Sequence, residues 1–168
     1  NAALDYEGVW VMDSAPALGT FDYPEIMTGE AEVEAILAAQ IDGRVLDEFN
    51  KITPEEVLDA PDDFFVVNFW GQADWDHYGH IAGAWQVTPP KADETDGDLT
   101  LDTLDILDPA ETIVIYCWTG QTASMVTAWL NVLGYDAAGM LWSSNAIIYD
   151  TLEGHKWSAS ADLAYVTD

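Results

Sequence analysis

Residues 113–126 read IVIYCWTGQTASMV, and this stretch decides the fold. Its first four residues are apolar β-formers, which predict a short buried strand. The only cysteine of the chain, Cys117, follows at once, and a turn of small and polar residues comes next. Apolar residues then recur at helical spacing, i, i+3, i+4 and i+7, at Val126, Trp129, Leu130 and Leu133. Gly134 is typical of a helix end, so we expect a strand, a cysteine loop and an amphipathic helix.

The position of Cys117 at the start of a helix favours a chemical role. Backbone N–H groups of the loop and the helix dipole both stabilise an anion at this place. They favour the thiolate, which is the nucleophilic form of cysteine. A lone cysteine at the end of an apolar strand is more often a small buried hydrophobe. Residues 119–122 are small or polar where a core would need bulk, and they favour the nucleophile.

Length and composition indicate one globular domain. The chain has 168 residues, of which 49% are apolar, so it can bury a full core. The single cysteine excludes an internal disulfide framework. No stretch of about 20 apolar residues is present, so we expect no transmembrane helix.

The charge balance is strongly acidic. Four Lys and Arg residues stand against 31 Asp and Glu, which gives a net charge of −27. Such a surface repels nucleic acids and anionic lipids, so neither is an expected partner. The chain begins without Met, and we expect an exported protein, periplasmic or extracellular, whose signal has been removed. The alternative is the cytoplasm of a salt-adapted organism, where an acidic, hydrated surface maintains solubility.

The pattern along the chain divides it into three parts. Residues 1–49 are expected to form an N-terminal extension that packs on the core, with a helix over residues 30–40 that Gly43 ends. Residues 50–158 form the main domain, and residues 159–168 a C-terminal tail.

Helices and strands alternate in the main domain. Thr53 is a helix N-cap before Pro54, and a short helix follows. Residues 64–69 predict a buried strand, residues from 73 onward a helix, and residues 86–87 a short strand after a turn. Residues 91–105 form a polar surface loop. With the strand at 113–116 and a final apolar piece at 137–141, the alternation predicts an α/β fold with a mostly parallel sheet.

Three segments together resemble a known family. Residues 79–84 read GHIAGA, residues 117–124 read CWTGQTAS, and residues 133–135 read LGY. In this order and spacing they are similar to a single-domain rhodanese, a sulfurtransferase. The resemblance covers residues 51–157, and it implies a central, mostly parallel five-stranded sheet with helices on both faces. It places the cysteine loop at the carboxyl end of the central strand, where α/β folds bind ligands.

The resemblance also implies a reaction and its residues. In the family, the cysteine attacks the outer sulfur of a donor and becomes a persulfide, and a thiophilic acceptor then takes the sulfur. By position, Cys117 is the catalytic residue. The partners are a sulfane-sulfur donor and a thiol acceptor, each a small molecule or a protein, and no cofactor or metal is implied. The loop residues that cradle the charged sulfur through backbone N–H groups are Trp118, Thr119, Gly120, Gln121, Thr122 and Ala123.

The chain departs from the family pattern at three places. An Asp-x-Arg triplet usually ends the strand before the first helix, but Asn68-Phe69-Trp70 stands here. The cysteine loop often carries a cation, whereas residues 117–124 hold no charge. A Gly-Gly pair usually follows the last strand, where residues 142–145 read WSSN. A neutral loop on an acidic protein is a poor site for the thiosulfate dianion, so we expect weak thiosulfate activity and a neutral, apolar or protein-borne donor that stacks on Trp118.

Other residues allow competing interpretations. Asn68, Trp70 and His80 are expected to support the site, with a structural role favoured for His80 because such histidines bond neighbouring loops. His77 and His80, with Asp74 or Asp76, have zinc-ligand chemistry but no second ligand cluster accompanies them. Three aspartates in the polar loop fail the spacing of a calcium loop; they are Asp93, Asp96 and Asp98.

Alternative activities follow from the cysteine loop. Tyrosine phosphatases need an Arg six residues after the cysteine to hold phosphate, and Ala123 stands there. An arsenate reductase also needs a cationic loop. Two alternatives to a sulfurtransferase remain: a non-catalytic rhodanese-like module that binds a protein or a sulfur compound, and a redox-sensing thiol that needs a partner thiol.

Overall fold

The computed structural model describes residues 8–26, 29, 31–46, 50–90 and 97–158. A five-stranded sheet forms its centre, with the strand order β2-β7-β6-β3-β5. All four neighbouring pairs are parallel. The strands are β2 (Lys51–Ile52), β3 (Phe65–Asn68), β5 (Trp85–Gln86), β6 (Ile113–Tyr116) and β7 (Ala137–Met140). The α/β fold predicted from the sequence is confirmed, and β6, the strand that precedes Cys117, is the central one.

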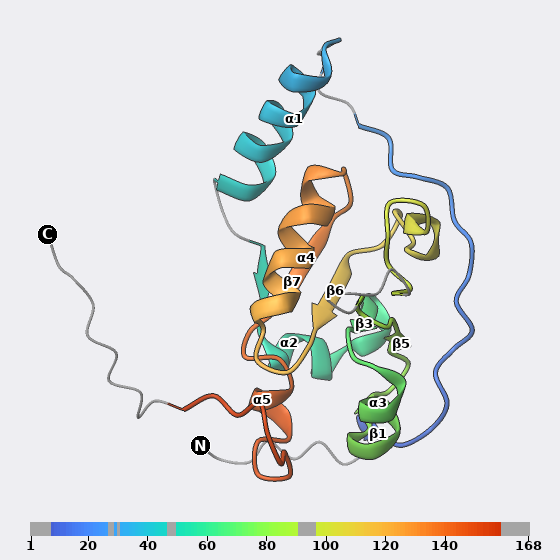
Figure 1. The fold of residues 1–168 in the computed structure, drawn as a ribbon, viewed down its shortest axis with the longest axis vertical. Coiled ribbons are helices and arrows are strands. Elements are labelled where there is room, and N and C mark those ends of the chain that lie inside the picture. The colour runs from blue at the N-terminus through green and yellow to red at the C-terminus, as the bar shows by residue number, and fades with distance from the viewer. Residues whose placement is uncertain (1–7, 27–28, 30, 47–49, 91–96, 159–168) are drawn as a thin grey trace, which may run out of the picture.

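Helices cover both faces of this sheet (Figure 1). Helix α4 (Gln121–Val132) packs on one face, with α1 (Val33–Ile41) beside it. Helix α2 (Pro54–Asp59) lies on the other face, where Trp75 of α3 (Gln72–Tyr78) joins the same buried cluster. The remaining short elements are η1 (Asp42–Leu46), η2 (Pro61–Asp63), η3 (Leu104–Ile106) and α5 (Ser144–Ile147).

The side chains of β6 alternate between the two faces, as in any strand. Ile113 and Ile115 belong to the buried cluster under α4, and Cys117 continues this row. Val114 and Tyr116 belong to the cluster on the opposite face. The period of two therefore directs the cysteine side chain toward α4.

The helix ends follow the sequence in two cases and depart from it in one. Thr53 and Glu56 form a capping box at the start of α2, as expected from Thr53. Gly134, with φ +97°, follows the end of α4. The prediction that Gly43 ends the first helix is wrong, because the chain continues through it as the π-helical turn η1. Gly43 has no positive φ, so it lacks the left-handed conformation in which glycine commonly ends a helix.

The described part of the N-terminal extension lies against the domain. Its strand β1 (Trp10–Val11) pairs antiparallel with β4 (His80–Ile81). The Trp10 ring packs edge-on against Trp70 and Tyr116, and its indole N–H donates to the Tyr78 carbonyl (2.7 Å). Further along, Phe21 packs against Phe65 of β3. The predicted C-terminal tail, residues 159–168, lies outside the described residues.

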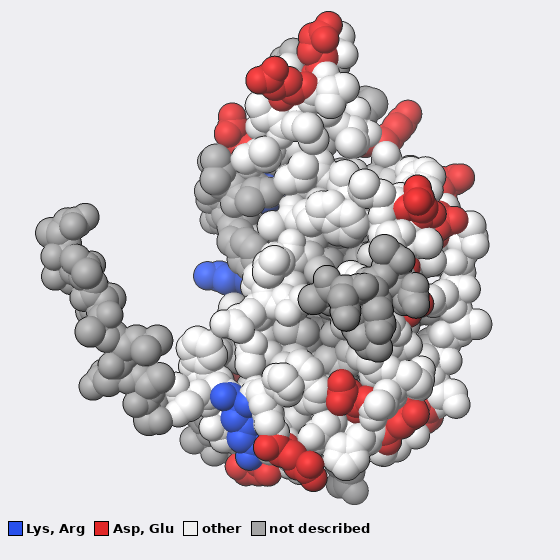
Figure 2. Space-filling model, viewed as in Figure 1, with Lys and Arg blue, Asp and Glu red and all other residues white. Residues whose placement is uncertain are grey.

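Acidic side chains occupy several separate places on the surface (Figure 2). In the same view a broad region over α4 is free of charge, and this helix contains no charged residue. Within the described residues, the structure has no helix of the length and apolarity that a membrane crossing requires.

Candidate functional site

Cys117 stands at the carboxyl end of the central strand, between β6 and the start of α4. It is a free cysteine, and only 4% of its surface is exposed. Three loop residues separate it from the helix, and the last of them, Gly120, takes the left-handed conformation with φ +92°. Ligands of open parallel sheets bind at this edge, so the structure places the thiol where the fold offers a site.

A polar turn after β7 holds the backbone of the cysteine loop. The Ser143 hydroxyl accepts a hydrogen bond from the Cys117 N–H (3.1 Å). The Cys117 carbonyl accepts from the Ser144 hydroxyl (2.6 Å) and the Ser144 N–H (3.2 Å). The Trp118 carbonyl accepts from the side chain (2.7 Å) and the N–H (3.1 Å) of Asn145. Two successive carbonyls of the loop are therefore fixed toward this turn.

The fixed carbonyls determine where the next N–H groups point. In a trans peptide the C=O and the following N–H point in opposite directions. The N–H groups of Trp118 and Thr119 are thus directed away from the turn. Within the described part of the chain, no hydrogen bond is recorded for the N–H groups of residues 118–123. This row joins the unpaired N–H groups that every helix start presents, and it suits an anion.

The polar turn has an unusual backbone. Trp142 and Ser143 are both non-glycine residues with positive φ, 61° and 49°. Such conformations cost about 1–3 kcal/mol each and persist where the surroundings enforce them. Ser143 is fully buried, and its hydroxyl also donates to the Met140 carbonyl (3.2 Å). The turn keeps this conformation because its polar groups are bonded to the cysteine loop.

Trp118 lies between two other rings. Trp70 stacks on one face, with ring centroids 4.2 Å apart, and His155 stacks on the other at 5.0 Å. Tyr78 meets Trp118 edge-on at 5.2 Å. In this conformation Trp70 and His155 cover the two faces of Trp118, and the expectation that a donor stacks on this ring stays a prediction.

The three residues expected to support the site lie at different places. Trp70 is fully buried and touches the loop through Trp118. Asn68 pairs with Tyr116 in the sheet register, so its side chain lies on the face opposite Cys117. It is close enough to the Tyr116 phenol to influence the pKa of that group, which burial raises strongly, but neither of its polar atoms makes a hydrogen bond of good geometry.

His80 joins the N-terminal extension to the domain. Its buried ring stacks on Trp75 at 3.5 Å, and its Nε2 is 2.7 Å from the Asp13 carboxylate. Burial lowers the pKa of His80, and the hydrogen bond and charge of Asp13 partly oppose this effect. These contacts favour the structural role expected for this histidine.

The metal alternatives gain no support from the geometry. His77 is exposed and lies 3.8 Å from Glu153, while His80 is buried against Asp13. Nowhere in the described ranges do three His, Cys, Asp or Glu side chains gather as a metal site needs. Asp93 and Asp96 lie outside the described residues, and Asp98 accepts a hydrogen bond from the Thr88 N–H.

The comparison with known families matches this architecture. The family model of the rhodanese-like domain matches residues 35–149. The chain belongs to the rhodanese-like domain family. A rhodanese-related protein from Thermoplasma volcanium has a similar structure, with a TM-score of 0.48 and 13% sequence identity over 61% of this chain and 94% of that one. No curated protein matches the chain.

This rhodanese-like domain has an aromatic ring where the family pattern has a charge, and a polar turn where the pattern has two glycines. Trp70 stands where the pattern has Arg, and it stacks on the loop. In the WSSN turn, where a Gly-Gly pair is usual, Ser144 and Asn145 donate to the loop carbonyls, and the Ser143 hydroxyl accepts from the Cys117 N–H. Of the three described cations, Arg44 binds the Tyr135 carbonyl, Lys156 lies over the Tyr149 ring, and Lys51 is exposed on β2, so none has a contact with the described residues 117–124.

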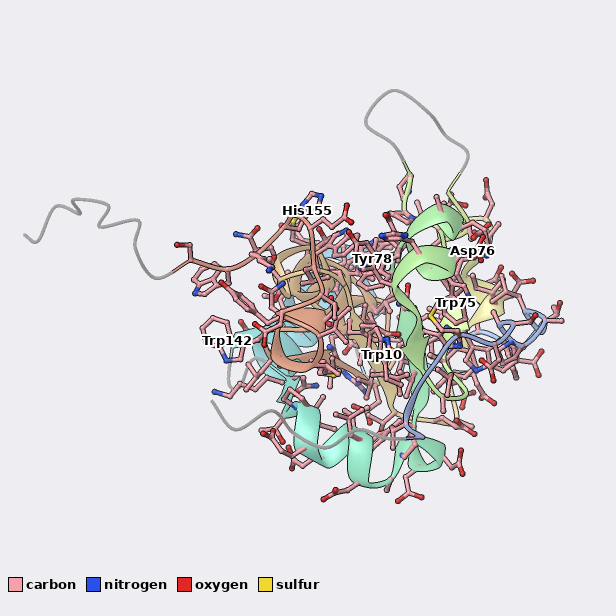
Figure 3. The ribbon with its side chains drawn as sticks, turned by 90° about the horizontal axis from the view of Figure 1, so that it is seen from below. Trp10, Trp75, Asp76, Tyr78, Trp142 and His155 are labelled. Atoms are coloured by element: carbon pink, nitrogen blue, oxygen red, sulfur yellow. The ribbon has the colours of Figure 1, made fainter. Side chains whose placement is uncertain are left out.

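Sequence reasoning missed the residues that shape the site from a distance. Ser144 and Asn145 were visible only as a departure from a glycine pair, although buried Ser and Asn after a strand commonly bind backbone groups. Tyr78 and His155 carry no sequence signal, since only the fold brings them to Trp118. Seen from the carboxyl end of the sheet, Tyr78, Trp142 and His155 come from three separate segments (Figure 3).

Proposed function

We propose that this rhodanese-like domain is a sulfurtransferase that carries sulfur as a persulfide on Cys117. Family membership fits either a sulfurtransferase or a binding module. The observation that favours the enzyme is the row of N–H groups at residues 118–123, which directly follows the only cysteine in the sequence and donates to no described residue. A structural cysteine has no need for an anion site.

The proposed reaction has two steps. The Cys117 thiolate attacks the outer sulfur of a donor, a new S–S bond forms, and the donor's own bond to that sulfur breaks. With thiosulfate, the electron pair leaves on sulfite. An acceptor thiolate then attacks the outer sulfur of the persulfide, takes it, and releases Cys117 as the thiolate. The loop N–H groups stabilise the negative charge on sulfur in both steps.

The uncharged loop sets the expected donor. Residues 117–124 carry no charge, and the whole chain has a net charge of −27. A dianion such as thiosulfate is repelled by this field and gains no ion pair at the loop. We therefore propose weak thiosulfate activity and better use of donors with one negative charge or none.

The test is the mass of the intact protein after incubation with thiosulfate, and separately with a persulfide or polysulfide. We expect a gain of one sulfur atom in wild type, faster with the second class of donor, and no gain in Cys117→Ser. A reduced Cys117 that reacts with iodoacetamide but gains sulfur from no donor rejects the proposal.

One observation favours the binding module as a second candidate. The Cys117 side chain is almost fully buried, and Trp70 and His155 enclose the neighbouring Trp118. In that case sulfur compounds or a partner bind at the loop without transfer. The same mass measurement separates the two, because a module gains no covalent sulfur.

A further inference from the structure

The segment 152–157 crosses the cysteine loop on its outer side. At one end, the Glu153 N–H donates to the Tyr78 hydroxyl (3.4 Å). At the other end, the Trp157 ring lies 5.5 Å from Trp142. Between them, His155 stacks on Trp118. The segment is therefore the outer wall of the site.

Asn145 joins this wall to the loop. Its side-chain N–H groups donate to the Trp118 carbonyl (2.7 Å) and the His155 carbonyl (3.0 Å). Its side-chain amide oxygen, Oδ1, accepts a hydrogen bond from the Trp157 N–H (2.6 Å). One nearly buried amide thus bonds the loop and the segment at once, and it fixes the backbone of His155 rather than its ring.

The His155 ring is held weakly. It is exposed, and within the described residues its imidazole nitrogens have no hydrogen-bond or ion-pair partner. Its backbone has a positive φ of 52°, which is unfavourable for a residue other than glycine. The stack on Trp118 is the contact that holds the ring, and a ligand of similar shape can take its place.

Displacement of His155 uncovers the outer face of Trp118, the residue that follows Cys117. The thiol is 4% exposed, and Trp118 beside it is covered on the inside by the fully buried Trp70. The outer cover, His155, is the exposed one of the two rings. Moving the imidazole aside frees a flat, uncharged indole face that the edge of Tyr78 borders.

We propose that His155 is the specificity-determining residue of the site and holds the place of a planar aromatic group on the sulfur donor. This inference rests on the proposed sulfurtransferase function and names its donor class: a sulfane-sulfur compound with one negative charge and an aromatic ring. The ring stacks on Trp118, and the loop N–H groups receive the single charge.

An aryl thiosulfonate has this chemistry. The Cys117 thiolate attacks its terminal sulfur, and a new S–S bond forms. The S–S bond to the sulfonyl sulfur breaks, and the electron pair leaves on the aryl sulfinate. The methyl analogue carries the same reactive group and charge without the ring, so the two donors isolate the effect of stacking.

Binding is tested first with unreactive probes, benzenesulfonate and methanesulfonate, by calorimetric titration of the full chain. We expect benzenesulfonate to bind more tightly than methanesulfonate, and His155→Ala to tighten benzenesulfonate severalfold while leaving methanesulfonate unchanged. His155→Gly, which also relieves the strain of the positive φ, is expected to tighten benzenesulfonate binding in the same way. Tyr23→Ala, which removes an exposed ring elsewhere, is the control and changes neither affinity.

Three results overturn the inference: no binding of benzenesulfonate to any variant, equal changes for both sulfonates, or no change in His155→Ala. The reactive pair, benzenethiosulfonate and methanethiosulfonate, then tests transfer by the mass of the protein. Selective benzenesulfonate binding without a gain of sulfur on Cys117 rejects the sulfurtransferase and keeps the aromatic site. A gain of sulfur on Cys117 without selective binding of benzenesulfonate keeps the sulfurtransferase and rejects the aromatic site.

Discussion

The hydroxyl of Ser144 donates a 2.6 Å hydrogen bond to the carbonyl of Cys117, across 27 residues of sequence. Ser144 is fully buried, and the same hydroxyl lies 3.2 Å from the Trp118 carbonyl. This relationship ties the carboxyl end of β6 to the turn after β7. The hydrogen bond fixes the peptide plane between Cys117 and Trp118, so the Trp118 N–H points to the opposite side of the loop.

Replacing Ser144 with Ala is expected to weaken both the fold and the site. The variant loses a buried hydrogen bond, so its free energy of unfolding in urea falls by about 1–2 kcal/mol. Sulfur gain at Cys117 slows because the loop N–H groups lose their alignment. Thr151→Ala is the matched control, since its hydroxyl also donates to a carbonyl, that of Ile148, but at the surface. Equal effects of the two variants contradict the role of Ser144.

Substitutions at two glycines distinguish the stability cost of backbone strain from the cost of side-chain crowding. Gly120 and Gly134 have φ values of +92° and +97°. A Cβ on Gly120 meets no atom closer than 3.6 Å, whereas one on Gly134 lies 2.9 Å from Ile26 Cγ1. Gly120→Ala is expected to cost about 1–2 kcal/mol of unfolding free energy from strain alone. Gly134→Ala costs more, because crowding is added to the same strain.

The two variants also differ in function. Gly120→Ala is expected to slow sulfur gain at Cys117, since it alters the loop, and Gly134→Ala at the far end of α4 is not. The measurements are urea unfolding and the rate of sulfur gain by mass. A larger loss of stability in Gly120→Ala than in Gly134→Ala contradicts the assignment of strain.

The fold was predictable because its signals are local. The run 113–116 is continuously apolar, and the helix after it repeats its apolar residues at helical spacing. Both elements form where predicted. The pair β1–β4 was not predictable, since each strand has two residues and the pairing joins positions about 70 apart. Short strands carry too few side chains to show a period.

Only Cys117 and the loop that follows it could be predicted from the sequence as parts of the site. Cys117 and the loop after it follow from one strand–loop–helix unit. The partners Ser144, Asn145 and His155 reach the loop through the order of strands in the sheet, which places β7 beside β6. The sequence showed an uncharged loop and suggested a free Trp118, but stacking by a distant histidine carries no local pattern.

Stability is expected to depend on pH through His80. Burial lowers the pKa of this histidine in the folded state below the ordinary value near 6.5. The unfolded chain then binds more protons between the two pKa values, so stability rises with pH in that window. The contribution is fully present above about pH 6.5 and is lost as the pH falls toward the folded pKa. Urea unfolding from pH 5 to 7.5 measures it.

Two variants test whether His80 causes this pH dependence of stability. His80→Gln removes the titrating group, so its unfolding free energy changes less with pH than that of wild type in this window. Asp13→Asn removes the partner that raises the pKa of His80, so the folded pKa falls further and the dependence becomes steeper. If wild type and His80→Gln have the same slope, carboxylates rather than His80 set the pH dependence.

A cation placed beside the loop is expected to restore the use of thiosulfate. Thr122 is exposed, lies in the first turn of α4, and makes no hydrogen bond within the described chain. Two unit charges 4 Å apart interact by about 4 kcal/mol near a protein surface, and tenfold in rate needs only ~1.4 kcal/mol. Thr122→Lys is therefore expected to accelerate sulfur gain from thiosulfate by about tenfold at low salt.

Control variants distinguish the local effect of a lysine at residue 122 from the effect of a change in net charge. Leu101→Lys makes the same change of net charge at an exposed position away from the loop and is expected to have little effect. Thr122→Gln controls for size, and Thr122→Glu acts in the opposite direction. At 1 M salt the Debye length falls to about 3 Å, so the gain shrinks there. Equal acceleration by the lysines at 101 and 122 means that net charge, and not the neutral loop, limits thiosulfate use.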